Sequence, residues 1–326
     1  MSIKNVQALI AEDFNKVNES IMAALSSDVA LINELGAYII LSGGKRLRPM
    51  MTVLCAKAAQ YTGDKHISAA ALIEFIHTAT LLHDDVVDHS DMRRGKETAN
   101  AIWGNEASVL VGDFLYTRAF QMMVDLDSMQ VMRVLAQATN RIAEGEVLQL
   151  LNIKEPDITE ANYFNVIYSK TAKLFEAAAE VAGIMAYETS GQPEYQIEAF
   201  REYGKFVGTA FQLIDDILDY TASAEEMGKN TGDDLAEGKP TLPLIRAIQM
   251  GTPEEAELVR TALLNADVSQ LDEILKIIER TESLTYTYQK ACEQVEMAIK
   301  AIEPIADSPY KEALVELAKY SIARKF

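Results

Sequence analysis

Residues that cross-link or interrupt a chain are scarce in this sequence. Of 326 residues, only 2 are cysteine, 8 are proline and 16 are glycine. Cys55 and Cys292 stand alone, without the spacing of a zinc site or a redox pair, and they indicate a reducing, cytoplasmic setting. Long stretches rich in Ala, Leu, Glu, Ile and Gln favour helices, and no segment alternates regularly enough to predict a sheet. We therefore expect an all-α fold.

Positive charge and long apolar runs are also limited. The chain has 30 basic against 49 acidic residues, which gives a net charge of −19. This balance argues against nucleic acid as a partner, because phosphate backbones demand clustered positive charge. No run reaches the length that spans a membrane, and the amphipathic N-terminus lacks the basic start and apolar core of a secretory signal.

The hydrophobic pattern predicts a series of helices separated by short polar breaks. We expect them over residues 3–26, 28–41, 50–60, 68–88, 105–125, 128–150, 160–188 and 195–220, with further helices from 242 to the end. A disordered linker would explain the polar, glycine-rich interval that follows the helix at 195–220. We interpret this interval as a mobile lid, because its lysines could close on a leaving diphosphate. The length of the chain allows either two domains of common size or one large helical domain.

Two of these helices carry the same acidic run, in which two aspartates four residues apart share a face and a third lies beside them. The aspartates are Asp84, Asp85 and Asp88 in LLHDDVVD, and Asp215, Asp216 and Asp219 in FQLIDDILDY. A solvated acidic face would explain one such run, but both runs interrupt apolar helices, where clustered carboxylates are costly unless cations neutralise them. Oxygen ligands of this kind suit Mg²⁺, which keeps its other positions for water and substrate phosphates. We predict one shared Mg²⁺ centre that binds a diphosphate.

Several basic and polar residues in apolar or glycine-rich surroundings are candidates for contacts with that diphosphate. They are Lys45, Arg46 and Arg48 in GGKRLRP, His77 before the first acidic run, Arg93, Arg94 and Lys96 in the loop 89–98, Lys170 and Lys173 in YSKTAKLF, Gln212 one turn before Asp215, and Lys229 and Lys239 in the lid. Arginine forks match diphosphate oxygens, and an ammonium on an apolar helix needs an anion. A solvated basic turn, a packed core histidine and lysines whose heads reach water would also account for these residues. Lys170 and Lys173, three residues apart, are expected on one helix face.

The ordered motifs GGKRLRP, LLHDDVVD with SDMRRG, YSKTAKLF, and FQLIDDILDY with GKNTGDDLAEGKPTLPL resemble those of the trans-type polyprenyl diphosphate synthases, above all the octaprenyl-forming bacterial members. The similarity covers essentially the whole chain. It implies one all-helical domain over residues 1–326 around a central cavity, assembled as a homodimer. The implied activity condenses isopentenyl diphosphate with an allylic diphosphate such as farnesyl diphosphate, for the side chain of a respiratory quinone. An apolar product is expected to bring the enzyme transiently to a membrane surface.

The resemblance also implies roles for the candidate residues. The principal Mg²⁺ ligands would be Asp84, Asp88 and Asp215, with Asp85, Asp216 and Asp219 completing or orienting the site. Isopentenyl diphosphate would be held by Lys45, Arg48, His77 and Arg94. The allylic diphosphate would be surrounded by Arg93, Lys170, Thr171, Gln212, Lys229 and Lys239, of which all but Arg93 would act in catalysis.

Product length is expected to depend on where the cavity is blocked. Ala79 and Thr80, one turn before Asp84, are small, whereas short-chain farnesyl-type members carry a bulky aromatic there. We hypothesise that Met123, or a nearby apolar residue such as Leu135, forms a deeper floor. On this hypothesis Ala79→Tyr shortens the product.

Other functions stay open on the sequence alone. A shorter-chain farnesyl or geranylgeranyl diphosphate synthase would share the chemistry, and a terpene cyclase would share the acidic motif without needing a second basic pocket. A carboxylate-bridged di-iron bundle would require Glu-x-x-His pairs, which the two acidic helices lack. A purely structural helical subunit would not explain the embedded aspartates.

Overall fold

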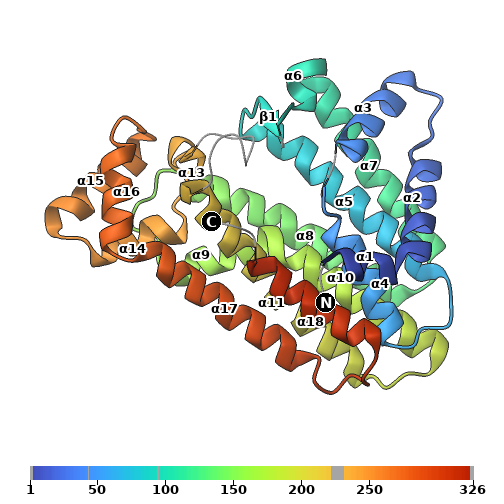
Figure 1. Cartoon of the computed structure of the whole chain (residues 1–326). Helices are drawn as coiled ribbons and strands as arrows, with labels where there is room; N and C mark the ends of the chain where they lie inside the picture. Colours follow the sequence, from blue (N-terminus) through green and yellow to red (C-terminus); the bar gives the residue numbers. More distant parts are fainter. Residues whose placement is uncertain (1–2, 43, 94, 222–230, 324–326) are drawn as a thin grey trace.

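The computed structural model describes residues 3–42, 44–93, 95–221 and 231–323, which form a bundle of helices (Figure 1). The first helices are α1 (Ile3–Leu9), α2 (Ala11–Leu25), α3 (Ala30–Leu41), α4 (Leu47–Ala58), α5 (Lys65–Val87), α6 (Ala99–Trp103) and α7 (Asn105–Asp125). The middle of the chain forms α8 (Met129–Asn152), α9 (Glu160–Ile167), the π-helix η1 (Tyr168–Ala172), α10 (Lys173–Ser190) and α11 (Tyr195–Thr221). The last helices are α13 (Asp233–Ala236), α14 (Leu242–Met250), α15 (Pro253–Asn265), α16 (Leu271–Arg280), α17 (Ser283–Ala301) and α18 (Pro309–Ile322). The prediction of an all-α fold is confirmed.

A minimal hairpin between α5 and α6 was not expected from the sequence. Its antiparallel strands, β1 (Met92–Arg93) and β2 (Lys96–Glu97), pair Met92 with Glu97 and Arg93 with Lys96. Strands of two residues are too short to show the alternation by which a strand is recognised. The hairpin matters because it places Arg93 beside the end of α5.

Two helix boundaries differ from expectation in ways that affect the site. The helix expected from residue 50 begins three residues earlier, at Leu47, because Arg46 adopts a left-handed conformation (φ 46°) and acts as its N-cap residue. Arg48 is therefore on the first turn of α4 and not in the preceding turn. The helix expected over 160–188 is divided by the π-helix η1, which changes the directions of the side chains that follow it.

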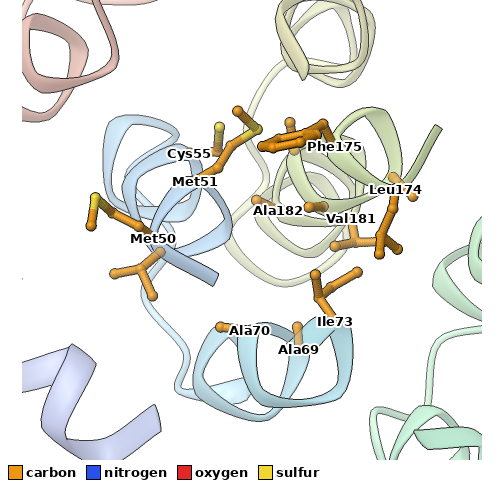
Figure 2. Close-up of a cluster of buried hydrophobic side chains, with 14 of the residues drawn as sticks. Met50, Met51, Cys55, Ala69, Ala70, Ile73, Leu174, Phe175, Val181 and Ala182 are labelled. Atoms are coloured by element: carbon orange, nitrogen blue, oxygen red, sulfur yellow. The ribbon is translucent and has the colours of Figure 1, made fainter. Parts of the chain in front are cut away.

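Helix α10 lies at the centre of the bundle, where it packs against α4, α5, α8 and α11. Figure 2 shows the core between α4, α5 and α10. Its labelled side chains are Met50, Met51 and Cys55 from α4, Ala69, Ala70 and Ile73 from α5, and Leu174, Phe175, Val181 and Ala182 from α10. Cys55 is fully buried here and has a free thiol. Each large aliphatic or aromatic side chain buried in such a core contributes about 1.5–3 kcal/mol. The alanines let the helix axes approach closely, so α10 is a fixed support for its neighbours.

Helix α11 approaches η1 and α10 at two glycines. A methyl group on Gly208 would lie 2.6 Å from the Cα of Ala172 and 2.9 Å from the Cβ of Phe175. A methyl group on Gly204 would meet the carbonyl oxygen of Phe175. These contacts are with backbone or Cβ atoms, which cannot move aside, so the two glycines determine how closely the second acidic helix sits against η1.

The last third of the chain adds a second, smaller core. Its buried residues come from the end of α11 and from α13, α14, α15 and α16, and include Tyr220, Leu235, Leu244, Val259 and Ile277. In Figure 1 the orange helices α14, α15 and α16 lie away from α1 to α7, while α17 packs against both α11 and α14. That residues 1–326 form one domain stays a prediction. Within the described segments, we find no helix with the combination of length and apolarity needed to cross a membrane.

The close approach at Gly208 predicts that Gly208→Ala is destabilising. The added methyl group must push α11 away from η1, and overpacking of this kind typically costs about 1–3 kcal/mol. We expect a lower midpoint of thermal unfolding and reduced activity, measured on the same preparation. Gly112→Ala is the matched control, because there the three atoms nearest to the added methyl group belong to the partly exposed ring of His83, a side chain that can rotate away. Equal losses in the two variants would contradict the prediction.

Candidate active site

A cavity of about 830 Å³ lies between the start of α4, the second half of α5, α8, α9, η1, α11 and the segment after α13. Both acidic runs reach it. Asp84 and Asp88 line it from α5, whereas Asp215, Asp216 and Asp219 line it from α11. The structure therefore brings together two motifs that are more than a hundred residues apart, as the shared centre requires. Their role as metal ligands stays a prediction.

Asp85 differs from its neighbours because it does not line the cavity. Its side chain is fully buried, and its Oδ1 accepts a hydrogen bond from Nε of Arg93 at 2.8 Å, with Nη2 of Arg93 at 2.7 Å. The arginine comes from strand β1, and its side chain is one of those lining the cavity. Asp85 thus orients Arg93. Its contacts do not indicate a direct ligand of a metal ion.

A chain of side-chain hydrogen bonds runs from η1 to α9 through the second acidic run. The hydroxyl of Thr171 donates to Oε1 of Gln212 (2.8 Å), and Nε2 of Gln212 donates to Oδ1 of Asp216 (2.9 Å). The hydroxyl of Tyr163 donates to Oδ2 of the same aspartate. Both oxygens of this buried carboxylate are therefore occupied, so Asp216 holds the network in place.

The second acidic run lies in surroundings that disfavour negative charge. Burial, followed by the charge of Asp234, raises the pKa of Asp216 well above its ordinary value. The same two causes raise the pKa of Asp219 to about 9, although the backbone N–H of Asp234 donates to its Oδ2 at 3.2 Å. Carboxylates in this condition favour a bound cation.

Two lysines of the cavity wall, Lys170 and Lys239, are each held between two carboxylates. Nζ of Lys170 lies 2.7 Å from Oε2 of Glu146 and 3.5 Å from Oδ2 of Asp84. Nζ of Lys239 lies 3.0 Å from Oδ2 of Asp88 and 2.5 Å from Oε2 of Glu237. Burial alone would lower the pKa of each lysine, but these carboxylates outweigh it and raise both pKa values. Both ammonium groups are therefore positively charged at neutral pH.

A second basic group lines the cavity near the start of α4. Lys45, Arg48 and His77 are all at the wall, with Nη1 of Arg48 3.3 Å from Nε2 of His77. The guanidinium of Arg48 also stacks on the ring of Phe175 at 4.1 Å, which keeps it in one orientation. His77 lies seven residues before Asp84 on α5, about 10 Å along the helix axis. Lys170 and Lys239 contact Asp84 and Asp88, so the cavity has two basic ends.

The expected chain-length residues do not all reach the cavity. Thr80 lines it, whereas Ala79, Met123 and Leu135 are fully buried in the core and are not among the lining residues. The reason is angular, because neighbouring side chains on a helix point in directions about 100° apart, so Ala79 faces the packed side of α5 while Thr80 faces the cavity. Among the small residues before Asp84, the one at the cavity wall is Thr80.

The expectation that Lys170 and Lys173 share a face is wrong. Lys173 lines a separate recess beside Arg133 and Arg141, and its Nζ lies 2.5 Å from Oε1 of Glu176. Lys170 belongs to the π-helix, whose wider turn alters the angle between residues three apart. Periodicity calculated for an α-helix could not show this.

Some residues at the site were not singled out from the sequence. Glu146, Gln149, Tyr163 and Asp234 all line the cavity. Asp234 and Glu237 belong to the motif GKNTGDDLAEGKPTLPL, which could have drawn attention to them. Glu146 and Tyr163 carry no such signal, because single polar residues within helices usually face solvent. Two expected site residues, Arg94 and Lys229, lie outside the residues that the structure describes, as does the part of the expected lid at residues 222–230.

The donor set of the cavity is suited to a hard divalent cation. Its acidic walls offer carboxylate oxygens, and the raised pKa of Asp219 marks a place where a cation would stabilise the ionised carboxylate. Within the described segments, no three His, Cys, Asp or Glu side chains converge closely enough to hold a metal by themselves. Ligands divided between α5 and α11 agree with a metal that keeps several positions for water and substrate phosphates.

Comparisons with known proteins agree with this architecture. A model of the polyprenyl synthetase family matches residues 29–280. The octaprenyl diphosphate synthase of Escherichia coli (strain K12) is 56% identical over 325 residues, covering 99% of this chain and 99% of that protein. The crystal structure of a polyprenyl synthase from Caulobacter crescentus CB15, complexed with calcium and isoprenyl diphosphate, is 44% identical with a TM-score of 0.94, covering 99% and 98% of the two chains. A decaprenyl diphosphate synthase from Rhodobacter capsulatus is 43% identical with a TM-score of 0.92, covering 99% of each chain.

An all-α bundle with two facing aspartate runs among cavity lysines defines a prenyltransferase of the isoprenyl synthase class. The chain belongs to the polyprenyl synthetase family. This family uses a divalent metal and acts on isoprenoid diphosphates.

The raised pKa of Asp219 predicts a pH-dependent stability of the metal-free protein. Below its ordinary pKa of 3.8 the carboxyl is protonated in both the folded and the unfolded state. As the pH rises toward the folded value of about 9, the unfolded state ionises while the folded state keeps its proton, so the free energy of unfolding falls. This group alone contributes up to about 1.4 kcal/mol for each pH unit.

The measurement is thermal unfolding in EDTA at pH 6 and at pH 8.5. We expect Asp219→Asn to reduce the fall in midpoint that the wild type shows between the two pH values. We also expect added Mg²⁺ to stabilise the wild type more at the higher pH. Identical pH dependence of wild type and variant would show that Asp219 is already ionised at pH 6.

Proposed function

We propose that the chain is an octaprenyl diphosphate synthase, which adds isopentenyl diphosphate units head-to-tail to an allylic diphosphate such as farnesyl diphosphate. The observation that carries the proposal is the 56% identity along the whole chain to an enzyme of that name. The cavity supports it independently, because it has two acidic walls and two basic ends and so can hold two diphosphates. The product would supply the side chain of a respiratory quinone.

In this proposal the metal is Mg²⁺, held by Asp84, Asp88 and Asp215. When bound, Mg²⁺ neutralises the allylic diphosphate and stabilises the charge that builds on it as it departs. Asp219 completes the acidic wall on α11. Asp85 and Asp216 act indirectly, the first by orienting Arg93 and the second by fixing Gln212.

The cationic residues around the allylic end assist the same step. Lys170 and Lys239 are largely buried and charged, and their N–H groups can donate to the leaving diphosphate oxygens, which lowers the barrier to ionisation of the allylic C–O bond. Thr171 and Gln212 are bound to each other and present polar groups at the same wall. Lys229 is assigned to this end through the resemblance of its motif.

The other basic end holds isopentenyl diphosphate through Lys45, Arg48 and His77, with Arg94 assigned through the resemblance of its motif. The double bond of isopentenyl diphosphate attacks C1 of the allylic cation and forms the new C–C bond. Loss of a proton, taken up by the departed diphosphate, gives an allylic diphosphate longer by one unit. The apolar wall of the cavity, including Leu81, Ile167 and Phe211, keeps water from the cation.

A homodimer is proposed through the outer face of α7 and α8. Large apolar side chains are exposed there among the described residues, namely Val109, Leu110, Val124, Met129, Val147, Leu150 and Leu151. Exposed apolar side chains gathered on two adjacent helices favour an interface. Sedimentation velocity of the purified chain tests this, and a monomer at micromolar concentration would reject it. We also propose a cytoplasmic location, with transient membrane contact through the apolar product.

The function is tested by incubating purified protein with farnesyl diphosphate, labelled isopentenyl diphosphate and Mg²⁺, followed by product analysis. We expect a ladder of products that ends at octaprenyl diphosphate. An endpoint at geranylgeranyl or decaprenyl diphosphate would keep the reaction and reject the proposed product. A product formed without isopentenyl diphosphate would indicate a terpene cyclase.

The position of Thr80 at the cavity wall predicts that a substitution there alters product length. Thr80→Tyr places an aromatic ring at the cavity wall one turn before Asp84, so the growing chain should be blocked early and the ladder should end at shorter products. Ala79→Tyr instead inserts the ring into a fully buried position and is expected to destabilise the fold by about 1–3 kcal/mol. Chromatography of the products and thermal unfolding of both variants distinguish these effects. Unchanged product lengths for Thr80→Tyr would reject the assignment of the wall.

A further inference from the structure

Lys170 and Lys239 share a pattern of contacts that the proposed mechanism does not use. Each ammonium group has one partner in the first acidic run and one glutamate outside both runs. For Lys170 these are Asp84 and Glu146, and for Lys239 they are Asp88 and Glu237. The glutamate is the nearer partner in both cases, at 2.7 Å and 2.5 Å against 3.5 Å and 3.0 Å.

This difference becomes important when the aspartates bind metal. An aspartate oxygen that coordinates a divalent cation is a poorer acceptor for a lysine, because the cation withdraws its charge and repels the ammonium. A glutamate outside the acidic runs remains available. An ammonium has three N–H donors, so one bond to glutamate leaves two for diphosphate oxygens.

The backbone around Glu146 places it accurately opposite Lys170. A methyl group on the preceding residue, Gly145, would lie 2.7 Å from the backbone nitrogen of Lys170 and 2.8 Å from the Cβ of Ser169. Helix α8 and the π-helix therefore touch through their backbones at this point. Because the contact is so close, the next side chain on α8 reaches the ammonium group from a fixed position.

Glu146 and Glu237 would be unfavourable near a diphosphate if they were unpaired. Both carry the same sign of charge as the substrate, and Glu146 lines the cavity. Their ion pairs with the lysines remove this repulsion and direct the remaining lysine donors toward the substrate.

We propose that Glu146 and Glu237 are positioning residues, which hold the ammonium groups of Lys170 and Lys239 at the edge of the metal centre while the aspartates bind metal and the lysines bind diphosphate. This inference rests on the proposed function, because the lysines are assigned there to the allylic diphosphate. It adds two residues that act through the lysines and do not themselves touch the reacting atoms.

The test is a double-mutant cycle with Glu146→Gln, Lys170→Gln and the two combined. Glutamine keeps an oxygen acceptor for Lys170 but loses the negative charge that holds the ammonium group, so we expect Glu146→Gln to lower kcat by about tenfold or more. The KM for isopentenyl diphosphate should stay within about twofold, because that substrate binds at the other end. In the Lys170→Gln background, Glu146→Gln should change kcat by less than about twofold.

The assays are best run above neutral pH. Burial raises the pKa of Glu146 to about 7, although the charge of Lys170 acts in the opposite direction. At pH 8 the carboxylate of the wild type is therefore ionised in most molecules, and the comparison with glutamine measures the loss of its charge.

Calorimetric titration of inorganic pyrophosphate in the presence of Mg²⁺ gives a readout that does not need chain elongation. We expect Glu146→Gln to weaken pyrophosphate binding in the wild-type background and to leave it unchanged in the Lys170→Gln background. Glu237→Gln should show the same dependence on Lys239. If elongation fails in the wild type while this coupling is observed, the proposed function is wrong and the positioning role stands.

Glu144→Gln is the matched control, since Glu144 lies two residues earlier on α8, is exposed and contacts Arg141 and Asn140 away from the cavity. It should leave both measurements unchanged. Glu146→Asp, which keeps the charge on a shorter side chain, should retain more activity than Glu146→Gln, and circular dichroism checks that each variant is folded. The proposal would be overturned if Glu146→Gln lowered kcat and pyrophosphate binding equally in the wild-type and Lys170→Gln backgrounds. It would also be overturned if Glu146→Gln and Glu237→Gln both behaved like the wild type.

Discussion

Carboxylates crowded at a buried cavity require positive charge, and much of the surrounding structure meets this requirement. Asp84 and Asp88 on α5 are balanced by Lys170 and Lys239, and Asp85 by Arg93. On α11, burial and neighbouring carboxylates raise the pKa of Asp219 to about 9. The two acidic walls of the cavity therefore differ. The aspartates of α5 already have ammonium partners, whereas the carboxylates of α11 would be stabilised by a bound cation. A diphosphate with its metal would complete the charge balance of both walls.

This arrangement depends on close approach between helices. Gly208 lets α11 come against η1, and Gly145 lets α8 come against the same π-helix. Large side chains at either position would separate the elements that carry Lys170, Thr171 and Gln212. The alanine-rich α10 extends this close packing below the cavity, so the polar network is supported by a densely packed core. The activity of the site and the stability of the bundle are therefore expected to respond to the same substitutions.

Regular features of the site could be predicted from the sequence. Spacing of four residues identified the faces that carry Asp84, Asp88 and Asp215, and the apolar surroundings of these aspartates indicated a site and not a solvated surface. Features that depend on irregular backbone could not. The π-helix separates Lys170 from Lys173, and the hairpin delivers Arg93 to Asp85 and takes that carboxylate out of the cavity wall. Neither the π-helix nor the hairpin produces a periodic pattern of residue types in the sequence.

The sequence by itself determined the helical fold, the acid and base available for chemistry and, through its ordered motifs, the resemblance to a family. These are local properties, since they depend on residue type and on spacing within one helix. Only the tertiary structure decided that Glu146 meets Lys170, that Tyr163 meets Asp216, and that Thr80 and not Ala79 reaches the cavity. Such contacts join segments far apart in the chain or depend on the rotation of a helix against its neighbours. They are set by how the helices pack, and the spacing of residue types along one helix does not determine that packing.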